Sequence, residues 1–209
     1  MAWCPILPIV FSNMFTVVGA EVLPPMLATL RRAYPRLQIE LSLSNLNEDL
    51  LRRDADIAVR MAQPTQSALV AKRVGAVKLG TFASEAYLAD HGVPRAAADL
   101  LRGHALIGKD KETAYLAALA ASGLPLKRKD FALRTDNDLA QIGAIRAGVG
   151  IGICQVPLAA GPPPLTRVLP KLSFELPVWV ATHEDLRASR RVAVVFEHLV
   201  ASLGAYIRS

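Results

Sequence analysis

The residues best suited to bind a ligand in this sequence are polar side chains that follow short apolar segments. Thr135, Asp136, Asn137 and Asp138 separate an alternating apolar segment from a run with helical spacing. A helix that begins here has free backbone N–H groups in its first turn, and with the Thr135 hydroxyl these can bind an anion. The two acidic residues favour a second interpretation, in which they cap the helix themselves. The sequence alone leaves both interpretations open.

Arg60 is a second candidate, because it ends the apolar segment 56–59. A guanidinium group at the mouth of a cleft is well suited to bind a carboxylate. An arginine in a surface salt bridge fits the same pattern. The choice between the two depends on how deeply the side chain is buried.

The residue sets that perform catalysis or hold metals are missing from the sequence. None of the four histidines has the spacing of a metal site such as HExxH or a cysteine partner. There is also no GxSxG, P-loop or SxxK motif. We therefore expect a protein that is not an enzyme and that uses no metal or cofactor.

The segment 16–60 contains the elements that must position these side chains. A helix is predicted after Pro25 and is stopped by Pro35, which cannot continue the hydrogen-bond ladder. Its apolar face is formed by Met26, Leu27, Leu30 and Tyr34. The residues from Ile39 to Leu43 alternate between apolar and polar types, which predicts a strand.

A second helix and strand follow in the same order. Residues 45–47 offer caps for a short helix over 48–53, and the apolar segment 56–60 is a predicted strand. Alternating helices and strands are typical of parallel α/β architecture. Ligands bind to such sheets at the carboxyl ends of the strands, which here lie near Thr16, Asn45 and Arg60. The pattern predicts a small-molecule pocket.

The other elements are predicted from hydrophobic periodicity, from residues that cap helices, and from prolines and glycines that end them. The expected strands are a first strand at 6–11 or 9–15 and strands at 105–107, 131–135, 149–154, 168–169 and 178–181. Two further short apolar runs lie at 69–70 and 77–82. The expected helices begin at Ser84, 95, 111 and 135–138, and a clear amphipathic helix spans 192–203.

Composition restricts the class of protein without fixing its partner. The 209 residues suit one domain or two small ones, and 52% of them are hydrophobic. Lysine and arginine exceed the acids by 24 − 18 = 6, which fits either a solvated basic surface or an anionic partner. The only two cysteines, Cys4 and Cys154, suggest no disulfide framework and fit a reducing compartment. The apolar segment 1–20 is read as a first strand or, alternatively, as a cleaved signal.

Several segments together resemble a known family. VGAEVLPPMLATLRRAYPRLQIEL, DADIAVR, ASEAYLADHG, AIRAGVGIGICQVP and HEDLRASRRVAVVFEHL occur in that order. They look like the effector-binding domain of LysR-type transcriptional regulators, from about Val17 to the C-terminus. The pair formed by DADIAVR and the RAGVGI-type segment is the most specific part of the resemblance.

The resemblance implies the α/β fold of type 2 periplasmic binding proteins. Two Rossmann-like lobes would be joined by two crossover strands, with a small ligand in the cleft. Residues 1–80 and 157–209 would form one lobe and residues 81–156 the other. The chain departs from the family pattern in two places: no winged helix-turn-helix precedes the match, and the segment 11–16 matches the family's first strand poorly. Thr16 is the hydroxyl nearest to the family's usual effector contact there.

The hypothesis is therefore a cytoplasmic regulator domain that senses a small, anionic metabolite. By resemblance, it would form a homodimer through the helix at 25–34 and would reach DNA only through the missing helix-turn-helix domain. No membrane contact is expected. The alternative is a periplasmic solute-binding protein with residues 1–20 as its signal peptide. The predicted effector contacts are Thr16, Asn45, Arg60, Lys109, Thr135, Asp136, Asn137 and Gln155.

Overall fold

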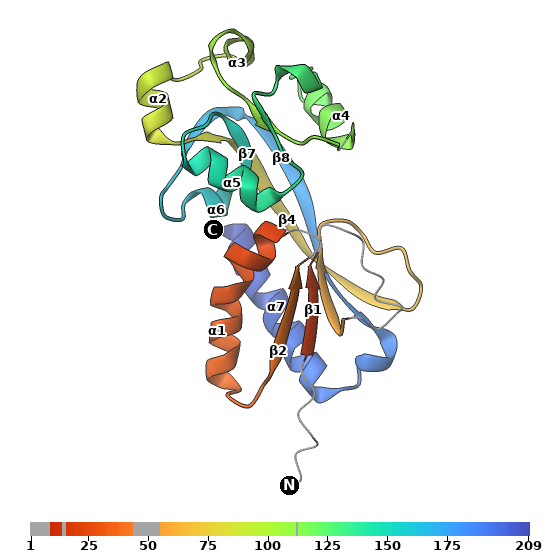
Figure 1. The fold of residues 1–209 in the computed structure, drawn as a ribbon. Helices are drawn as coiled ribbons and strands as arrows, with labels where there is room; N and C mark the ends of the chain where they lie inside the picture. Colours follow the sequence, from red (N-terminus) through yellow and green to blue (C-terminus); the bar gives the residue numbers. More distant parts are fainter. Residues whose placement is uncertain (1–8, 14–15, 44–54, 112) are drawn as a thin grey trace. The chain divides into compact units, whose positions relative to one another are not determined.

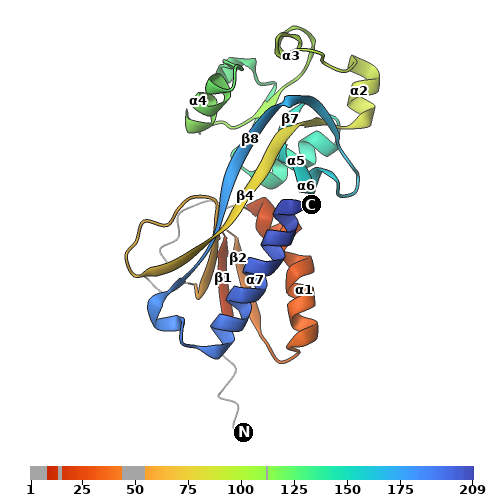
Figure 2. The same cartoon turned by 180° about the vertical axis from the view of Figure 1, so that it is seen from behind.

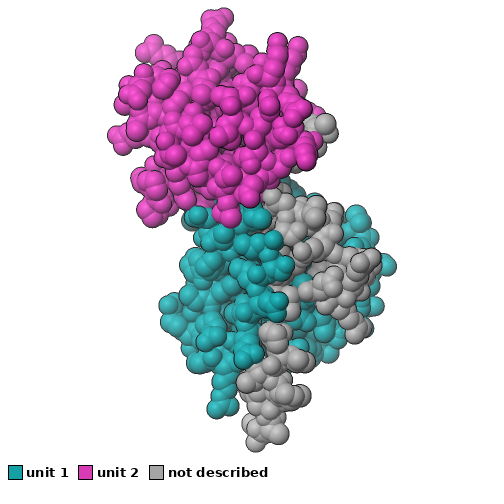
Figure 3. Space-filling model, in the orientation of Figure 1, with its two compact units in different colours: residues 1–77, 176–209 teal, residues 78–175 magenta. Residues whose placement is uncertain are grey.

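The computed structural model describes residues 9–13, 16–43, 55–111 and 113–209 (Figure 1). The chain divides into two compact units, coloured separately in Figure 3. Unit 1 comprises Met1–Val77 and Leu176–Ser209, and unit 2 comprises Lys78–Glu175. The division into lobes at 80/81 and 156/157 stays a prediction.

The strands of the main sheet follow the order β2-β1-β3-β8-β4-β7. In unit 1, β1 (Ile9–Asn13) pairs in parallel with both β2 (Ile39–Leu43) and β3 (Ile57–Arg60). The predicted parallel α/β pattern of this segment is confirmed, and so is the strand at 39–43. The first strand begins where the second of its two predicted ranges begins. In a parallel arrangement the carboxyl ends of these three strands share one edge.

The helix after β1 begins earlier than the sequence pattern predicts. A π-helical turn, Val18–Val22, leads directly into α1 (Leu23–Ala33), and Leu23 N–H donates to Val18 O. Pro24 and Pro25 have no N–H to donate, so the regular ladder is interrupted at their position and the turn widens. Tyr34, which the spacing places on the apolar face of this helix, follows the helix and is 44% exposed.

The C-terminal helix α7 (Arg190–Arg208) is the long amphipathic helix that the spacing predicts. Its buried side chains are Val192, Val195, Leu199 and Leu203. It contacts α1, and Figure 2 shows it lying in front of β1 and β2. A short 3-10 turn, η4 (Glu184–Leu186), precedes it.

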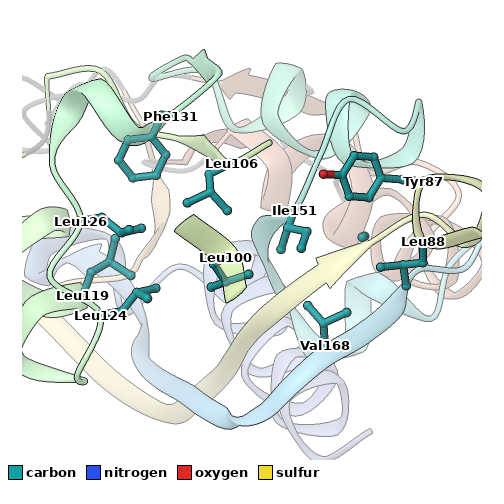
Figure 4. Close-up of a cluster of buried hydrophobic side chains, with 11 residues drawn as sticks. Tyr87, Leu88, Leu100, Leu106, Leu119, Leu124, Leu126, Phe131, Ile151 and Val168 are labelled. Carbon is teal, nitrogen blue, oxygen red and sulfur yellow. The ribbon is translucent and has the colours of Figure 1, made fainter. Parts of the chain in front are cut away.

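Unit 2 has its own hydrophobic core. Its helices are α2 (Glu85–His91), α3 (Ala97–Gly103), α4 (Thr113–Ala121), α5 (Asp138–Arg146) and α6 (Val156–Ala159), with a 3-10 turn, η3 (Arg128–Asp130). Its short strands are β5 (Ile107–Gly108), β6 (Leu133–Arg134) and β7 (Gly152–Gln155). The core gathers side chains from several of these elements, including Leu88, Leu100, Leu119, Phe131 and Ile151 (Figure 4).

Two long strands each join segments that the sequence pattern treats as separate. The apolar runs at 69–70 and 77–82 belong to one strand, β4 (Leu69–Ala83), and those at 168–169 and 178–181 belong to β8 (Thr166–His183). The intervening part of β8 alternates between partly buried Leu172 and Phe174 and exposed Ser173 and Glu175. This period of two is a strand signal that apolar runs alone do not reveal.

The capping predictions of unit 2 are confirmed. The Ser84 hydroxyl accepts a hydrogen bond from Tyr87 N–H at 3.2 Å at the start of α2. The glycines that end helices, Gly92, Gly123 and Gly148, all have positive φ. The predicted helix over 48–53 lies outside the described residues.

Candidate functional site

The predicted contacts of unit 1 lie at the carboxyl edge of its parallel strands. Arg60 is the last residue of β3, and the end of β1 is level with it, because Asn13 pairs with Val59. Thr16 is partly exposed and stands at the start of the helical segment after β1. Asn45 lies outside the described residues. The structure therefore places Thr16 and Arg60 after neighbouring strands.

Arg60 is buried, with only 7% of its surface exposed. The side chain therefore does not lie on the open surface, and the choice between a ligand contact and an ion pair within the chain stays open. Across the sheet Arg60 pairs with Trp179 of β8 in antiparallel register, so the two side chains lie on the same face. The Trp179 Nε1 is buried and has no hydrogen-bond partner in the described part of the chain.

Arg60 and Trp179 share their face with small residues. Strand alternation places Ala58 beside Arg60 and Ala181 beside Trp179, and both alanines are at most 2% exposed. Leu69 and Ala71 pack against these alanines. Arg60 and Trp179 bring a guanidinium and an indole N–H, both hydrogen-bond donors, to the same face at the end of β3.

The predicted contacts of unit 2 gather at the carboxyl ends of three strands. β5 pairs with β6 in parallel, and Leu106, just before β5, forms a parallel bridge with Ile151, just before β7. The carboxyl ends of β5, β6 and β7 therefore face one edge. Lys109 follows β5, Thr135 to Asn137 follow β6, and Gln155 ends β7 with 5% exposure.

The segment after β6 has the geometry of helix capping. The Asn137 Oδ1 accepts from Leu139 N–H at 2.9 Å and from Ala140 N–H at 3.1 Å. The Thr135 hydroxyl accepts from Asn137 N–H at 3.1 Å. The first N–H groups of α5 are thus bound by the chain's own side chain, as in an N-cap. An additional role of these residues in anion binding stays a prediction.

Asp136 binds backbone amides of the neighbouring loop. Its Oδ1 accepts from Asp110 N–H at 2.9 Å and from Lys111 N–H at 3.1 Å. Asp110 in turn accepts from Arg128 at 2.7 Å and from Arg134 at 3.1 Å. The hydrogen bond from Arg128 is the largest cause that holds the pKa of Asp110 below its usual range. Asp136 follows β6 and binds the amides of Asp110 and Lys111, which follow β5. It therefore fixes the loop after β5 to the segment after β6.

Lys109 forms an ion pair with Asp138, the first residue of α5, and each side chain is 12% exposed. One turn further along α5, the Gln141 Nε2 donates to the Ile153 carbonyl of β7 at 2.9 Å. These two contacts attach the first turn of α5 to the ends of β5 and β7.

The predicted effector contacts do not include Asp138, Gln141 or Trp179. Gln141 could have been noticed in the sequence, because it is a polar residue between apolar positions on one face of a predicted helix. Trp179 is harder to notice, since an indole in an apolar strand is usually a core residue. A small apolar hollow in unit 2 is lined by core residues such as Leu119 and Phe131 and contains none of the predicted contacts.

Two further features concern the class of the protein. Within the described ranges, no three histidine, cysteine or acidic side chains lie together in a way that would hold a metal ion. In the same residues, no helix is both long and apolar enough to cross a membrane.

Comparison with known proteins identifies the type of domain. The family model of the LysR substrate binding domain matches residues 13–204. A transcriptional regulator of Xanthomonas campestris pv. campestris (strain 8004) is 34% identical over 83 residues, which are 38% of this chain and 24% of that protein. The regulator CrgA of Neisseria meningitidis serogroup C (strain 8013) is 25% identical over 191 residues. That match covers 88% of this chain and 63% of CrgA, so the chain spans less than two thirds of either relative.

Solved structures show the same fold at low sequence identity. The CrgA regulatory domain from Neisseria meningitidis has a TM-score of 0.82 and 22% identity, covering 95% of this chain and all of that domain. The effector domain of AmpR from Pseudomonas aeruginosa has a TM-score of 0.74 and 18% identity, covering 95% and 96%. The predicted α/β fold of the type 2 periplasmic-binding-protein kind is confirmed by this likeness.

Proposed function

The chain belongs to the family of LysR substrate binding domains, and on that premise we propose that it senses a small anionic metabolite for a transcriptional regulator. The whole regulator would act in the cytoplasm as a homodimer, with α1 at the contact between copies. DNA binding would belong to a separate helix-turn-helix domain. The role is sensing and not catalysis, as in the family of regulators to which the relatives belong.

The observation that carries the anionic part of the proposal is the burial of Arg60 at the carboxyl edge of unit 1. An arginine that is 7% exposed at the end of a parallel strand is well placed to bind a carboxylate through two hydrogen bonds. Trp179 supplies a further N–H on the same face. The net charge of +6 also favours the approach of an anion.

The alternative of a solute-binding protein with a cleaved signal fits the fold less well. Cleavage after residue 20 would remove β1, which pairs with both β2 and β3. It would also remove Ile9 and Val18, both 0% exposed, from the core of unit 1. A central strand and two core residues are costly to lose, so we propose that residues 9–20 belong to the folded domain.

The test is the melting temperature of the protein in the presence of a panel of small carboxylic acids. A ligand at a hundred times its Kd stabilises a protein by about 2.7 kcal/mol. For a chain of this size that is a rise in Tm of roughly 5–10 °C. We expect at least one acid to produce such a rise and Arg60→Met to remove most of it.

The matched control is Arg36→Met, because Arg36 is an exposed arginine of the same unit. It should retain the full response. A panel that leaves the Tm unchanged, or a response that Arg60→Met preserves, would contradict the proposal.

A further inference from the structure

One buried tyrosine of unit 2, Tyr87 in α2, contacts two histidines. Its ring stacks on the ring of His91, with 4.2 Å between the centroids and 10° between the planes. His104, which follows α3, lies beside the hydroxyl group, and its Nδ1 is 3.5 Å from the Tyr87 oxygen. Tyr87 is 3% exposed and belongs to the hydrophobic core of unit 2 (Figure 4). A change of charge on either histidine therefore acts on a core residue.

The Tyr87 hydroxyl joins two segments that are distant in the sequence. Its oxygen accepts from the Ala105 N–H at 2.8 Å. The Ala105 carbonyl accepts from Ile151 N–H at 2.8 Å, so the same residue is bound to the segment before β7. The hydroxyl thus attaches α2 to the chain that enters β5, whereas the predicted effector contact Lys109 follows that strand.

The protonation state of His104 decides whether the Tyr87 hydroxyl is satisfied. Buried phenol groups usually find a hydrogen-bond partner, and the Tyr87 oxygen already accepts from Ala105. Neutral His104 can accept the hydroxyl hydrogen at Nδ1, but an imidazolium carries N–H groups on both nitrogens and can only donate. Protonated His104 therefore offers the hydroxyl no acceptor and competes with Ala105 for its oxygen.

His91 can take up a proton without this conflict. Its Nδ1 lies 3.1 Å from the Tyr87 carbonyl, which can only accept, so this nitrogen carries a hydrogen in both states of the ring. A positive charge on His91 also lies over the face of an aromatic ring, which attracts cations. The two histidines therefore have opposite relations to the same tyrosine.

The charges around His104 act in both directions. Burial is the main cause that lowers the pKa of His104, and the charge of His91 lowers it further. Asp99 of α3 raises it, and Asp99 is itself influenced by Arg102. The turn 148–150, which approaches Tyr87 and Ala105, carries no ionisable side chain. The net result is that the fold favours neutral His104.

Beyond the binding of an acid, we propose that Tyr87, His91 and His104 form a pH-responsive joint in unit 2. Near neutral pH, His104 accepts from the Tyr87 hydroxyl, and the hydroxyl holds Ala105. In mild acid, protonation of His104 releases Ala105 from the hydroxyl and loosens α2 from the segment that enters β5.

The direction of the response follows from linkage. A histidine whose pKa is lowered in the fold stabilises the fold while it is neutral. That stability is fully present above the unfolded pKa of about 6.5 and is lost as pH falls through the folded pKa. The joint is therefore closed at about pH 7.5 and opens progressively in mild acid.

The test is hydrogen exchange of the whole chain, followed by NMR at about pH 7.5 and 5.5, with rates corrected for the intrinsic effect of pH. The Ala105 amide should lose protection about fivefold in acid, the size of one ordinary hydrogen bond. The reference is the Gln141 amide of α5, which donates to Asn137 O at 3.0 Å and should keep its protection. This reference separates opening of the joint from unfolding of unit 2.

Three variants assign the response. His104→Gln cannot take up a proton and should make Ala105 protection independent of pH. His91→Phe keeps the stacking and removes the charge that lowers the pKa of His104, so opening should begin at higher pH. Tyr87→Phe removes only the hydroxyl, and Ala105 should then exchange fast at both pH values.

The control is His183→Gln, because His183 belongs to unit 1. It should leave the pH response of Ala105 unchanged. The proposal is overturned if Ala105 protection relative to Gln141 is the same at both pH values in the parent chain. It is also overturned if His104→Gln keeps the parent's pH dependence, or if the His104 ring resonances do not titrate together with the loss of protection.

Discussion

The carboxyl edges of the two units use polar residues in different ways. In unit 1, the buried Arg60 pairs in register with Trp179 across the sheet, so a guanidinium and an indole share one face. In unit 2, most of the polar side chains bind one another or the backbone, as Asp136 and Asn137 do. The leftover groups in unit 2 are the acceptors of Asp138 and Gln141. A polar residue at a strand end is therefore a candidate ligand contact only after its partners within the chain have been counted.

The groups themselves differ between the units. Arg60 and Trp179 of unit 1 carry N–H donors, whereas the buried atoms of Asp138 and Gln141 in unit 2 are acceptors. The network of unit 2 holds its acceptors in place through Lys109 and Ile153. Variants that break contacts of this network should lower the stability of unit 2 and leave Arg60 and Trp179 of unit 1 unchanged.

The largest effect is expected from Gly150→Ala. A Cβ at Gly150 would overlap the Ala105 carbonyl oxygen, where the backbone segments before β5 and β7 approach each other. Backbone cannot move aside as a flexible side chain can, so we expect a loss of about 3 kcal/mol in the free energy of unfolding.

Urea denaturation measures this loss, and hydrogen exchange should show it in the amides of unit 2. The control is Gly103→Ala, because a Cβ at Gly103 meets no atom within 4 Å. It should be neutral or slightly stabilising. Equal effects of the two substitutions would show that the close approach at Gly150 is not a constraint.

An intermediate effect is expected from Lys109→Met. The substitution leaves Asp138 as a carboxylate at 12% exposure without its cation, at a cost of about 2 kcal/mol. Adding Asp138→Leu removes the orphaned charge and should restore most of the stability. A double variant no more stable than Lys109→Met in urea would show that the ion pair does not account for the loss.

The smallest effect concerns Asp99, which binds backbone amides of its own unit. Its Oδ2 accepts from Ala96 and Arg95 N–H, each at 2.9 Å, and these bonds lower the pKa of Asp99. A carboxylate with a lowered pKa stabilises the fold above its unfolded pKa, and that stability is lost as pH falls through the folded pKa. Asp99→Asn should therefore lower the Tm at about pH 6, and the difference from the parent protein should shrink as pH falls below the ordinary Asp pKa of about 3.9. A difference that is independent of pH would contradict the role of the ionised carboxylate.

Much of the fold was predictable from local signals. Ser84 and Gly92 mark the ends of α2, Pro35 marks the end of the α1 segment, and the spacing of Val192 to Leu203 predicts α7. The full length of strands β4 and β8 was not predictable from local signals, because charged residues such as Lys72 and Lys171 interrupt their apolar runs. Whether a strand continues through such residues depends on its pairing with distant segments, and the local composition carries no information about that pairing.

The places of the candidate residues in the fold were predictable, and their hydrogen-bond partners were less so. Topology places polar residues at strand ends, and Arg60 and Lys109 are found there. Which atoms are already paired depends on contacts between residues far apart in the chain, such as Gln141 with Ile153 or Asp136 with Asp110. Trp179 emerged only from its register with Arg60 across β3 and β8.

The most direct test of the acid-binding account is a calorimetric titration of the acid that raises the Tm most. The three proteins compared are the parent chain, Arg60→Met and Trp179→Phe. Arg60→Met should weaken the affinity roughly 30- to 100-fold, since it removes charge-assisted hydrogen bonds. Trp179→Phe, which removes only one N–H from the same face, should weaken it about five- to tenfold. Equal affinity in all three proteins would contradict the claim that unit 1 binds the acid.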